Sequence, residues 1–481
     1  MNKNDIFAAI ARHKSLNNLR PLSAIHTRED IEVSKTDGFV FGMTAEEWRE
    51  RYPSLPVENI FCNKADILPS SLIYYDKEKY IYVELPMYGG QCLDAGHFED
   101  VAVGAVRRME DAYEKKDYLY LLMANVSEGS GNIVVGIAKE MLRREIPSPS
   151  LYDAIIGAYT LVDNAVGFTS DDIRRLKACK SPGQKRQTRN ALDDTPNRVT
   201  VYRGMGAAST PLDRAISWTL NESVAYFFAC RRDSEHATVV KGTVPKKAIV
   251  EIIDGSEAEV LVAPDDVKVV ATTHCVPMDD FLRDVANIPC THRKGVSNPI
   301  VAVRDGIIAA YKGNTSSCHD KEHTIRVSLM AAYLFMHDFV PYAAANKFPA
   351  EHVSRMFWLL MDAVTYHDRG RVDDEEDIDH GERGYAVYTQ SHPKNPIVEF
   401  LIKGHVPDDS EMEYIFRRCK IRDIPYEEAV FLYMILKDAD ALDRWRFGGM
   451  SRDAVRVDML RIPTSKTLMG VAAGMQGMSL E

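Results

Sequence analysis

Residues 357–371 read FWLLMDAVTYHDRGR, and residues 432–444 read LYMILKDADALDR. In both segments apolar residues recur at steps of three or four, the spacing that places side chains on one face of a helix. The apolar stripe of the first segment continues onto Asp368, and that of the second continues onto Asp440. Because a buried carboxylate without a compensating cation is costly, the two segments predict helices that meet around a bound metal ion.

Histidine residues accompany the two aspartates. They are His323, His367, His380 and His405, in the segments HTIRVSLMAAYLF, VTYHDRGR, IDHGERG and LIKGHVPDD. Over about residues 310–450 this series resembles the HD-domain metal-dependent phosphohydrolases, in which a His precedes an adjacent His-Asp pair and an Asp follows it on separate helices. The resemblance implies an all-α HD domain that cleaves a phosphate ester or phosphodiester, with a phosphorylated nucleotide as substrate.

The resemblance also implies a set of metal ligands. One divalent ion would be held by His323, His367, Asp368 and Asp440. His380 and His405 would either bind a second ion bridged by Asp368 or contact the phosphate. Imidazole and carboxylate ligands without thiolate suit Mn, Fe, Zn, Co or Mg about equally. We therefore expect one or two divalent ions of open identity.

A zinc peptidase is the alternative interpretation for the start of this region. His319, Glu322 and His323 match the H-x-x-E-H pattern of inverted zinc peptidases. That pattern leaves Asp368 and Asp440 unexplained on apolar helix faces. The phosphohydrolase interpretation is therefore preferred.

The composition indicates a folded protein of several domains. Its 481 residues allow two to four domains, and 45% hydrophobic with 27% charged residues exclude a disordered chain, a collagen and a coiled-coil rod. The 59 Lys and Arg residues against 70 Asp and Glu residues give a formal net charge of −11. Contact with nucleic acid or anionic lipid would therefore need a local basic patch.

The sequence lacks the patterns of a secreted or membrane protein. Its eight cysteines are scattered without a CxxC pair, so neither a disulfide scaffold nor a zinc ribbon is expected. The stretch MNKNDIFAAIARHK does not resemble a signal peptide, and no run of about 18 apolar residues occurs. We expect a cytoplasmic protein, or one in the cytosol of a target cell if it is delivered there, without membrane contact.

Three regions follow from changes of pattern along the chain. Residues 1–115 alternate short apolar runs with Gly and Pro turns, which predicts an α+β module of unknown role. Residues 116–290 begin with helical segments and continue as the β-branched runs RVTVYRG, TVVKGTV, KAIVEII, AEVLVAP and VKVVATT, which predicts a second α+β domain. Residues 300–460 carry helical periodicity and should be all-α. The expected fold class is multidomain α+β.

Three short motifs lie in order on the β-rich part of the second region. VYRGM contains Arg203, ISWTLNESVAYFFA contains Ser217, and GSEAEVLV contains Glu257 and Glu259. Over roughly residues 120–275 they resemble the Arg-Ser-Glu class of mono-ADP-ribosyltransferases, which build an NAD site from an Arg, a Ser-centred strand and a Glu-x-Glu strand. The resemblance implies a split β-sheet, NAD as co-substrate and, from the first Glu, an arginine acceptor.

The chemistry of NAD cleavage suits these residue types. Breaking the nicotinamide glycosidic bond develops positive charge on the ribose, which a fixed carboxylate, Glu259, would stabilise. Arg203 would hold the pyrophosphate or ribose, and Ser217 would position Glu259 or the nicotinamide ribose. Residues two apart on a strand share a face, so Glu257 would orient or deprotonate the acceptor. Thr219 ends the motif that usually reads Ser-Thr-Ser in the family and is a further candidate NAD contact.

The leading interpretation is a bifunctional enzyme, an NAD-dependent mono-ADP-ribosyltransferase joined to a metal-dependent HD phosphohydrolase. A second interpretation is an HD nucleotide phosphohydrolase regulated by a non-catalytic NAD-binding module. A third is a binding scaffold in which both sites are inert. The candidate NAD site also has a purely structural alternative. In it, Ser217 caps a helix that starts near Glu222, and Glu257 and Glu259 form a solvated strand face.

A basic run lies upstream of the strands. Its cationic residues surround Ser181-Pro182-Gly183 and are Arg174, Arg175, Lys177, Lys180, Lys185, Arg186 and Arg189. Such a run is usually a solvated loop, which is the expectation here. The alternative is a docking site for an anionic target, RNA or DNA included, through phosphate contacts, although no aromatic residues interleave to stack bases.

Overall fold

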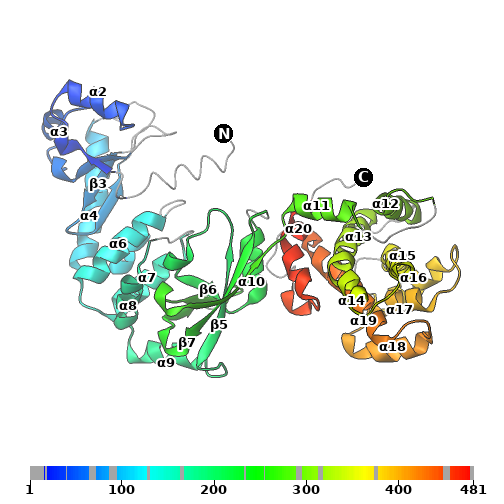
Figure 1. Ribbon diagram of the computed structural model, residues 1–481. Coiled ribbons are helices and arrows are strands. Elements are labelled where there is room, and N and C mark those ends of the chain that lie inside the picture. Colours follow the sequence, from blue (N-terminus) through cyan, green and yellow to red (C-terminus); the bar gives the residue numbers. More distant parts are fainter. Residues whose placement is uncertain are drawn as a thin grey trace.

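The computed structural model is a mixed α+β structure with two antiparallel sheets, which confirms the expected class. In Figure 1 a blue and cyan part leads through a green sheet to a yellow and red helical part. The parts follow one another in sequence order. The described residues are 16, 19–39, 41–63, 72–85, 95–126, 131–162, 167–231, 235–253, 255–288, 295–311, 318–372, 377–447 and 456–476.

The N-terminal part is built on a four-stranded sheet of order β1-β2-β3-β4. Its strands are β1 (Leu19–Pro21), β2 (Ile60–Asn63), β3 (Leu72–Asp76) and β4 (Ile81–Glu84). Helices of this part and of the next segment are α2 (Arg28–Thr36), α3 (Ala45–Arg51), α4 (Ala95–Glu114), α5 (Tyr118–Met123), α6 (Gly131–Arg144), α7 (Pro149–Tyr159), α8 (Ser170–Cys179) and α9 (Pro182–Asn190). One hydrophobic core contains buried residues from Leu22 to Cys179, so packing is continuous across the boundary expected near residue 115.

A six-stranded antiparallel sheet follows, in the order β10-β7-β5-β6-β9-β8. Its strands are β5 (Arg198–Met205), β6 (Ser217–Thr219), β7 (Thr238–Pro245), β8 (Glu251–Ile253), β9 (Glu259–Leu261) and β10 (Lys268–His274). Five of these strands lie within or overlap a β-branched run of the sequence, whereas β6 lies outside those runs and is expected only from the resemblance to a Ser-centred strand. Strands β5 and β7 pair along their length, whereas β5 and β6 meet at one residue pair, Tyr202 opposite Thr219. The sheet therefore consists of two three-stranded halves joined at that pair.

Helix α10 (Glu222–Cys230) packs closely against β5. Gly204 permits this approach, because a Cβ atom there would come within 1.9 Å of the carbonyl oxygen of Ala225. The backbone beside Arg203 is thereby held between the sheet and a helix.

The basic run of residues 174–189 forms two helices, α8 and α9, so the expectation of a solvated loop is wrong. Capping boxes at Thr169 and Ser181 begin the helices, and Pro182 occupies the first turn of α9. Lys180, between the two helices, is buried. Capping at Thr169 and Ser181 therefore favours helix formation in this segment despite its many positive charges.

After His274 the described residues form helices and no strand. The helices are α11 (Met278–Ala286), α12 (Pro299–Ala310), α13 (Lys321–Leu334), α14 (Val340–Ala345), α15 (Ala350–Tyr366), α16 (His380–Tyr388), α17 (Pro396–Gly404), α18 (Met412–Cys419), α19 (Tyr426–Leu442) and α20 (Met469–Gly474), with the π-helix η7 (Phe335–Phe339) and the 3₁₀ helix η9 (Asp443–Arg446). Helices α13, α15, α17 and α19 pack around a shared apolar core.

The sheet and the helical part are in contact. Helix α20 lies beside α10 at their junction (Figure 1). Tyr226 and Cys230 of α10 belong to the same core cluster as residues of α13 and α19, and Lys466 pairs with Glu222 at 2.9 Å. Helical packing thus continues past residue 460, where the sequence placed the end of the domain.

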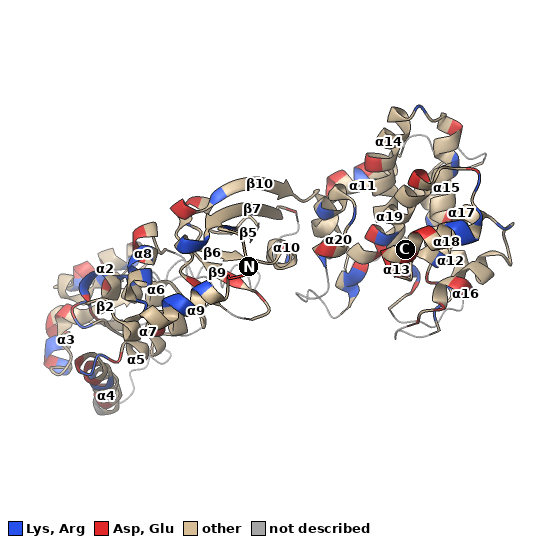
Figure 2. Cartoon of the chain, turned by 90° about the horizontal axis from the view of Figure 1, so that it is seen from below, with Lys and Arg blue, Asp and Glu red and all other residues tan. Residues whose placement is uncertain are grey.

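Acidic and basic residues are intermixed along the elements (Figure 2). In the described part of the chain, no helix is both long enough and apolar enough to cross a membrane. No disulfide joins the six described cysteines, while Cys92 and Cys290 lie outside the described residues.

Candidate functional site

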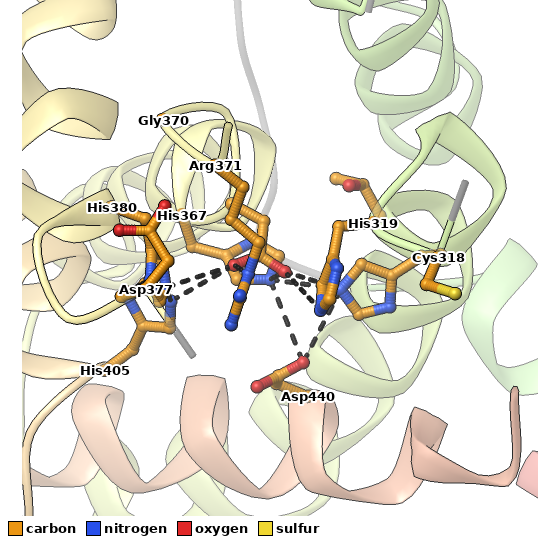
Figure 3. Close-up of polar contacts among 12 residues, drawn as sticks. Cys318, His319, His367, Gly370, Arg371, Asp377, His380, His405 and Asp440 are labelled. Carbon is orange, nitrogen blue, oxygen red and sulfur yellow. Dashed lines mark hydrogen bonds and ion pairs between the residues drawn. The ribbon is translucent and has the colours of Figure 1, made fainter. Parts of the chain in front are cut away.

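Five helices bring the predicted metal ligands of the helical part together. His323 lies in the first turn of α13, His367 caps the end of α15, His380 begins α16, His405 caps the end of α17, and Asp440 lies in α19. In Figure 3, His380 and His405 stand on one side of the centre and Asp440 reaches it from α19. The four histidines and Asp368 are all buried.

The first cluster consists of His323, His367, Asp368 and Asp440. His323 Nε2 lies 3.3 Å from Asp368 Oδ2, 3.5 Å from Asp440 Oδ1 and 3.3 Å from His367 Nε2. His367 Nε2 lies 3.5 Å from Asp368 Oδ2 and 3.9 Å from Asp440 Oδ1. Two ligand atoms that each lie about 2.1 Å from one ion are at most about 4.2 Å apart, so every one of these separations fits a shared ion.

The second cluster consists of Asp368, His380 and His405. His380 Nε2 lies 3.2 Å and His405 Nε2 lies 3.5 Å from Asp368 Oδ1, and the two Nε2 atoms are 2.9 Å apart. The two oxygens of Asp368 therefore face different clusters. Oδ2 faces His323 and His367, and Oδ1 faces His380 and His405.

The tautomers of these histidines suit a cation. Nδ1 of His367, His380 and His405 contacts the backbone carbonyl of Val364, Asp377 and Ile402 respectively, and a carbonyl can only accept a hydrogen bond. The proton of each neutral ring is therefore on Nδ1, and each Nε2 presents a lone pair. Two lone pairs only 2.9 Å apart would repel one another, and a metal ion or a shared proton between the two Nε2 atoms would relieve that repulsion.

Asp443 supports the first cluster from behind. Its Oδ2 accepts a hydrogen bond from His323 Nδ1 at 2.8 Å, and its two oxygens accept from Arg326 at 2.6 Å and 3.0 Å. Burial would raise the pKa of Asp443, but the hydrogen bonds from His323 and Arg326 lower it to about 2. Burial lowers the pKa of His367 to about 4. His367 is thus neutral, and a carboxylate orients His323; both features suit residues that could hold a metal ion.

Asp440 leaves the first cluster open to solvent. Its side chain is 32% exposed, whereas that of Asp368 is 3% exposed. Within the described part of the chain, Oδ1 of Asp440 is buried without a hydrogen-bond partner. A buried carboxylate oxygen of this kind fits metal coordination.

Asp368 itself departs from the sequence expectation in one detail. Helix α15 ends at Tyr366, so Asp368 lies in the turn beyond its C-cap and not on the helix. That turn passes close to α16, because a Cβ on Gly370 would lie 2.2 Å from the carbonyl oxygen of His380. Close packing of the turn buries Asp368 as completely as a helix face would.

His319 joins the same neighbourhood. It is buried, and its Nε2 lies 3.8 Å from Asp368 Oδ2. Figure 3 places it on the opposite side of the centre from His380 and His405. Glu322 is not a member of either cluster found among the described residues, so the cluster that contains His323 departs from the zinc-peptidase pattern.

A separate group of residues surrounds Glu259, at the junction of the two sheet halves. Glu259 begins β9 opposite Thr219 of β6. Its Oε1 accepts hydrogen bonds from Ser217 Oγ at 2.5 Å and from the Tyr159 hydroxyl of α7 at 2.6 Å. Burial and the neighbouring Glu259 raise the pKa of Tyr159 well above its usual range, so Tyr159 remains a donor. The carboxylate is thus held in one position by two hydroxyl groups.

Arg203 and Thr219 flank this carboxylate. Arg203 Nη1 donates to the Ser217 carbonyl at 2.6 Å, while its buried Nε has no hydrogen-bond partner among the described residues. The Thr219 hydroxyl donates to the Glu257 carbonyl at 2.6 Å and accepts from the Asn221 N–H at 3.0 Å. Arg203 therefore retains donor capacity for a ligand, whereas the Thr219 hydroxyl is engaged with the backbone.

Glu257 is placed differently from the expectation. Strand β9 begins at Glu259, and Glu257 lies in the preceding turn. Ala258 between them has a left-handed backbone with φ of 44°. The argument that the two glutamates share a strand face is therefore wrong, because side-chain alternation holds only within a strand.

Sequence reasoning missed two residues that matter to these sites. Asp443 follows Asp440 by three residues, one helical turn, and that spacing was an available signal. Tyr159 carries no motif, and its role depends on α7 packing 100 residues away in sequence from Glu259.

Comparison of the chain with protein-family models, curated proteins and solved structures finds no match. The arguments about function therefore rest on the site geometry.

Proposed function

We propose that the helical part is a metal-dependent phosphohydrolase. The observation that carries this proposal is the position of Asp368, a buried carboxylate whose two oxygens face two separate histidine groups. A carboxylate between two cations is the arrangement of two-metal phosphoester hydrolysis. The resemblance of the same residues to the HD-domain family supports the same activity.

Two sets of residues would hold metal ions at this site. His323, His367, Asp368 and Asp440 would hold one ion, and Asp368, His380 and His405 would hold a second. When bound, the ions supply a nucleophilic water at neutral pH and neutralise phosphoryl charge. The open side of Asp440 provides access, since its side chain is the more exposed of the two carboxylates.

Two arginines near the ligands could receive a phosphate. Arg371 Nε lies 3.1 Å from Asp368 Oδ1, and Arg446 Nη2 lies 4.0 Å from Asp440 Oδ1. A guanidinium group binds phosphate oxygens with a planar pair of donors. A phosphorylated nucleotide is therefore our preferred substrate class.

The test is phosphoester hydrolysis by the full chain, measured with a chromogenic phosphodiester and with nucleotides. Asp368→Ala should lower the rate by more than about a hundredfold, beyond the loss typical for removing a supporting residue. Glu259→Gln, which lies in the sheet, is the matched control and should leave this rate unchanged. Protein stripped of metal by a chelator that still hydrolyses these substrates at full rate would exclude the proposal.

The sheet supports a second candidate function, transfer of ADP-ribose from NAD with an arginine acceptor favoured. The observation that favours it is the double hydrogen bonding of Glu259 by Ser217 and Tyr159, beside the unused donor of Arg203. A preorganised carboxylate stabilises positive charge on a ribose without reorganisation. The division into two three-stranded halves agrees with the split sheet that the family resemblance implies.

NAD cleavage is tested by release of nicotinamide. Glu259→Gln keeps the shape and removes the charge, so release should fall at least about a hundredfold. Asp368→Ala is the reciprocal control and should not alter the NAD reaction. If the wild type binds NAD without releasing nicotinamide, the non-catalytic NAD-binding alternative is favoured.

A further inference from the structure

A cavity of about 490 Å³ lies between α8, α9 and the segment that joins β7 to β8. Its walls carry six cationic side chains, which are Lys177, Lys180, Lys185, Arg189, Lys246 and Lys247. No carboxylate occurs among the described residues that line it. This concentration of one charge contrasts with the formal net charge of −11 for the chain.

The floor of the cavity is a buried lysine with its own partners. Lys180 Nζ donates to the Val250 carbonyl at 2.8 Å and pairs with Glu251 at 3.1 Å, and it also contacts the Thr188 hydroxyl. Glu251 thereby balances the charge of Lys180. Lys177 and Lys246 donate hydrogen bonds to the backbone carbonyls of Lys247 and Thr195 respectively. Lys185, Arg189 and Lys247 form no ion pair with any described residue, so their charge is available to a ligand.

The positive charges of these side chains repel one another. Burial lowers the pKa of Lys177; the nearby Lys180 and Lys185 lower it further, while Asp266 partly offsets them. The exposed cations Lys185 and Arg189 belong to α9, and the exposed Lys247 lies on the opposite wall, in the 3₁₀ turn Lys246–Ala248. An anion between the two walls would relieve this repulsion.

Four of the remaining lining residues are apolar, Leu192, Pro245, Ile249 and Val250, and two are uncharged and polar, Thr188 and Asn197. A volume near 490 Å³ suits a small organic molecule, and a partly open space with an apolar wall and a cationic rim suits a molecule with an apolar ring system and several phosphates. Single-stranded nucleic acid is less well suited, because no aromatic side chain among the lining residues could stack against its successive bases.

We propose that this cavity binds a nucleoside di- or triphosphate, with its phosphates between Arg189 and Lys185 of α9 and Lys247 of the opposite wall. None of the lining residues belongs to the Glu259 group or to the metal clusters. The site is therefore independent of both proposed activities.

The test is binding of the α,β-methylene analogue of ADP to the full chain, by calorimetry. Arg189→Glu and Lys247→Glu should each weaken binding at least tenfold, the effect of losing one charge-assisted hydrogen bond. The matched control is Arg186→Glu, an exposed residue on the same helix that does not line the cavity, and it should change affinity by less than about threefold.

Two results would overturn the proposal. One is unchanged affinity in both Arg189→Glu and Lys247→Glu, which would indicate a site elsewhere. An equal loss of affinity in Arg186→Glu would count in the same way, because it would indicate a general electrostatic effect of the basic surface. The other is tight, cavity-dependent binding of a single-stranded RNA together with no binding of the ADP analogue. Protection of Lys185 and Lys247 from amine acetylation by the analogue, with exposed Lys35 unprotected, would support the location independently of any variant.

Discussion

Replacing Asp443 by Asn tests whether the first histidine group is a metal centre. Asp443 is fully buried and is not itself in either ligand cluster. It accepts hydrogen bonds from His323 Nδ1 and from Arg326, and Gln476 donates to it at 3.1 Å. An amide can accept with one oxygen only, and its NH₂ group would face cationic donors. Asp443→Asn therefore breaks at least one of these contacts and removes the charge opposite Arg326.

Two magnitudes follow from these contacts. Leaving Arg326 buried without its carboxylate should destabilise the helical part by about 3–5 kcal/mol, a large fraction of the about 5–15 kcal/mol that stabilises a typical domain. Loss of the carboxylate that orients His323 should weaken metal binding about 10–100-fold. The second effect is specific to a metal centre, whereas the first would follow from any buried ion pair.

The assay separates the two effects with a matched variant. Asp438 lies five residues earlier, is equally buried, and accepts from the backbone N–H groups of Arg461 and Ile462 and from the Ser465 hydroxyl. Both variants are equilibrated with graded chelator, their metal content is measured by elemental analysis, and their melting temperatures are recorded. Asp443→Asn should lose metal at a lower chelator concentration than Asp438→Asn does. Equal metal retention in the two variants would refute the assignment of His323 as a ligand.

Three further predictions concern other parts of the molecule. His380→Ala should reduce the metal content from two ions to one, and an unchanged count with lost hydrolysis would instead make His380 a substrate contact. Tyr159→Phe removes one of the two donors to Glu259 and should slow nicotinamide release about tenfold, measured beside the melting temperature to separate folding from catalysis. Asp409 has a lowered pKa: burial would raise it, but hydrogen bonds from Arg461, Tyr433 and Lys437 outweigh that effect. Its contribution to stability should be complete above about pH 5, start to decline near the unfolded value of about 3.9, and disappear only as the pH falls through the lowered folded pKa, so the difference in urea stability between wild type and Asp409→Asn should remain constant above about pH 5, persist at pH 3 and shrink below it.

Local patterns in the sequence were sufficient for much of the fold. Apolar steps of three and four predicted α15, which leads into the turn that contains Asp368, and α19, which carries Asp440, and β-branched runs predicted all strands of the second sheet except β6. These signals are readable because helices and strands repeat with fixed periods and bury one side of the chain. Periodicity placed Asp368 and Asp440 on apolar helix faces, the resemblance to HD-domain proteins implied the four histidines, and the structure brings all six residues into two clusters.

The sequence also misjudged two local features. The cationic segment at 174–189 is helical because caps at Thr169 and Ser181 begin helices, which charge counting does not reveal. Glu257 precedes its strand because the chain turns through a left-handed Ala258, and a motif of alternating glutamates gives no sign of that turn. Backbone conformation at single residues therefore limits inference from spacing.

By itself the sequence determined which residue types are present, their periodicity and hence the elements that carry them. Only the tertiary structure decided that the two oxygens of Asp368 face different histidine pairs, that Tyr159 reaches Glu259, and that cations from two separate segments, near Arg189 and near Lys247, line one cavity. The physical reason is distance along the chain. Contacts between residues that lie dozens to a hundred positions apart depend on how helices and strands pack, and the period of one segment carries no information about the partner that another segment brings to it.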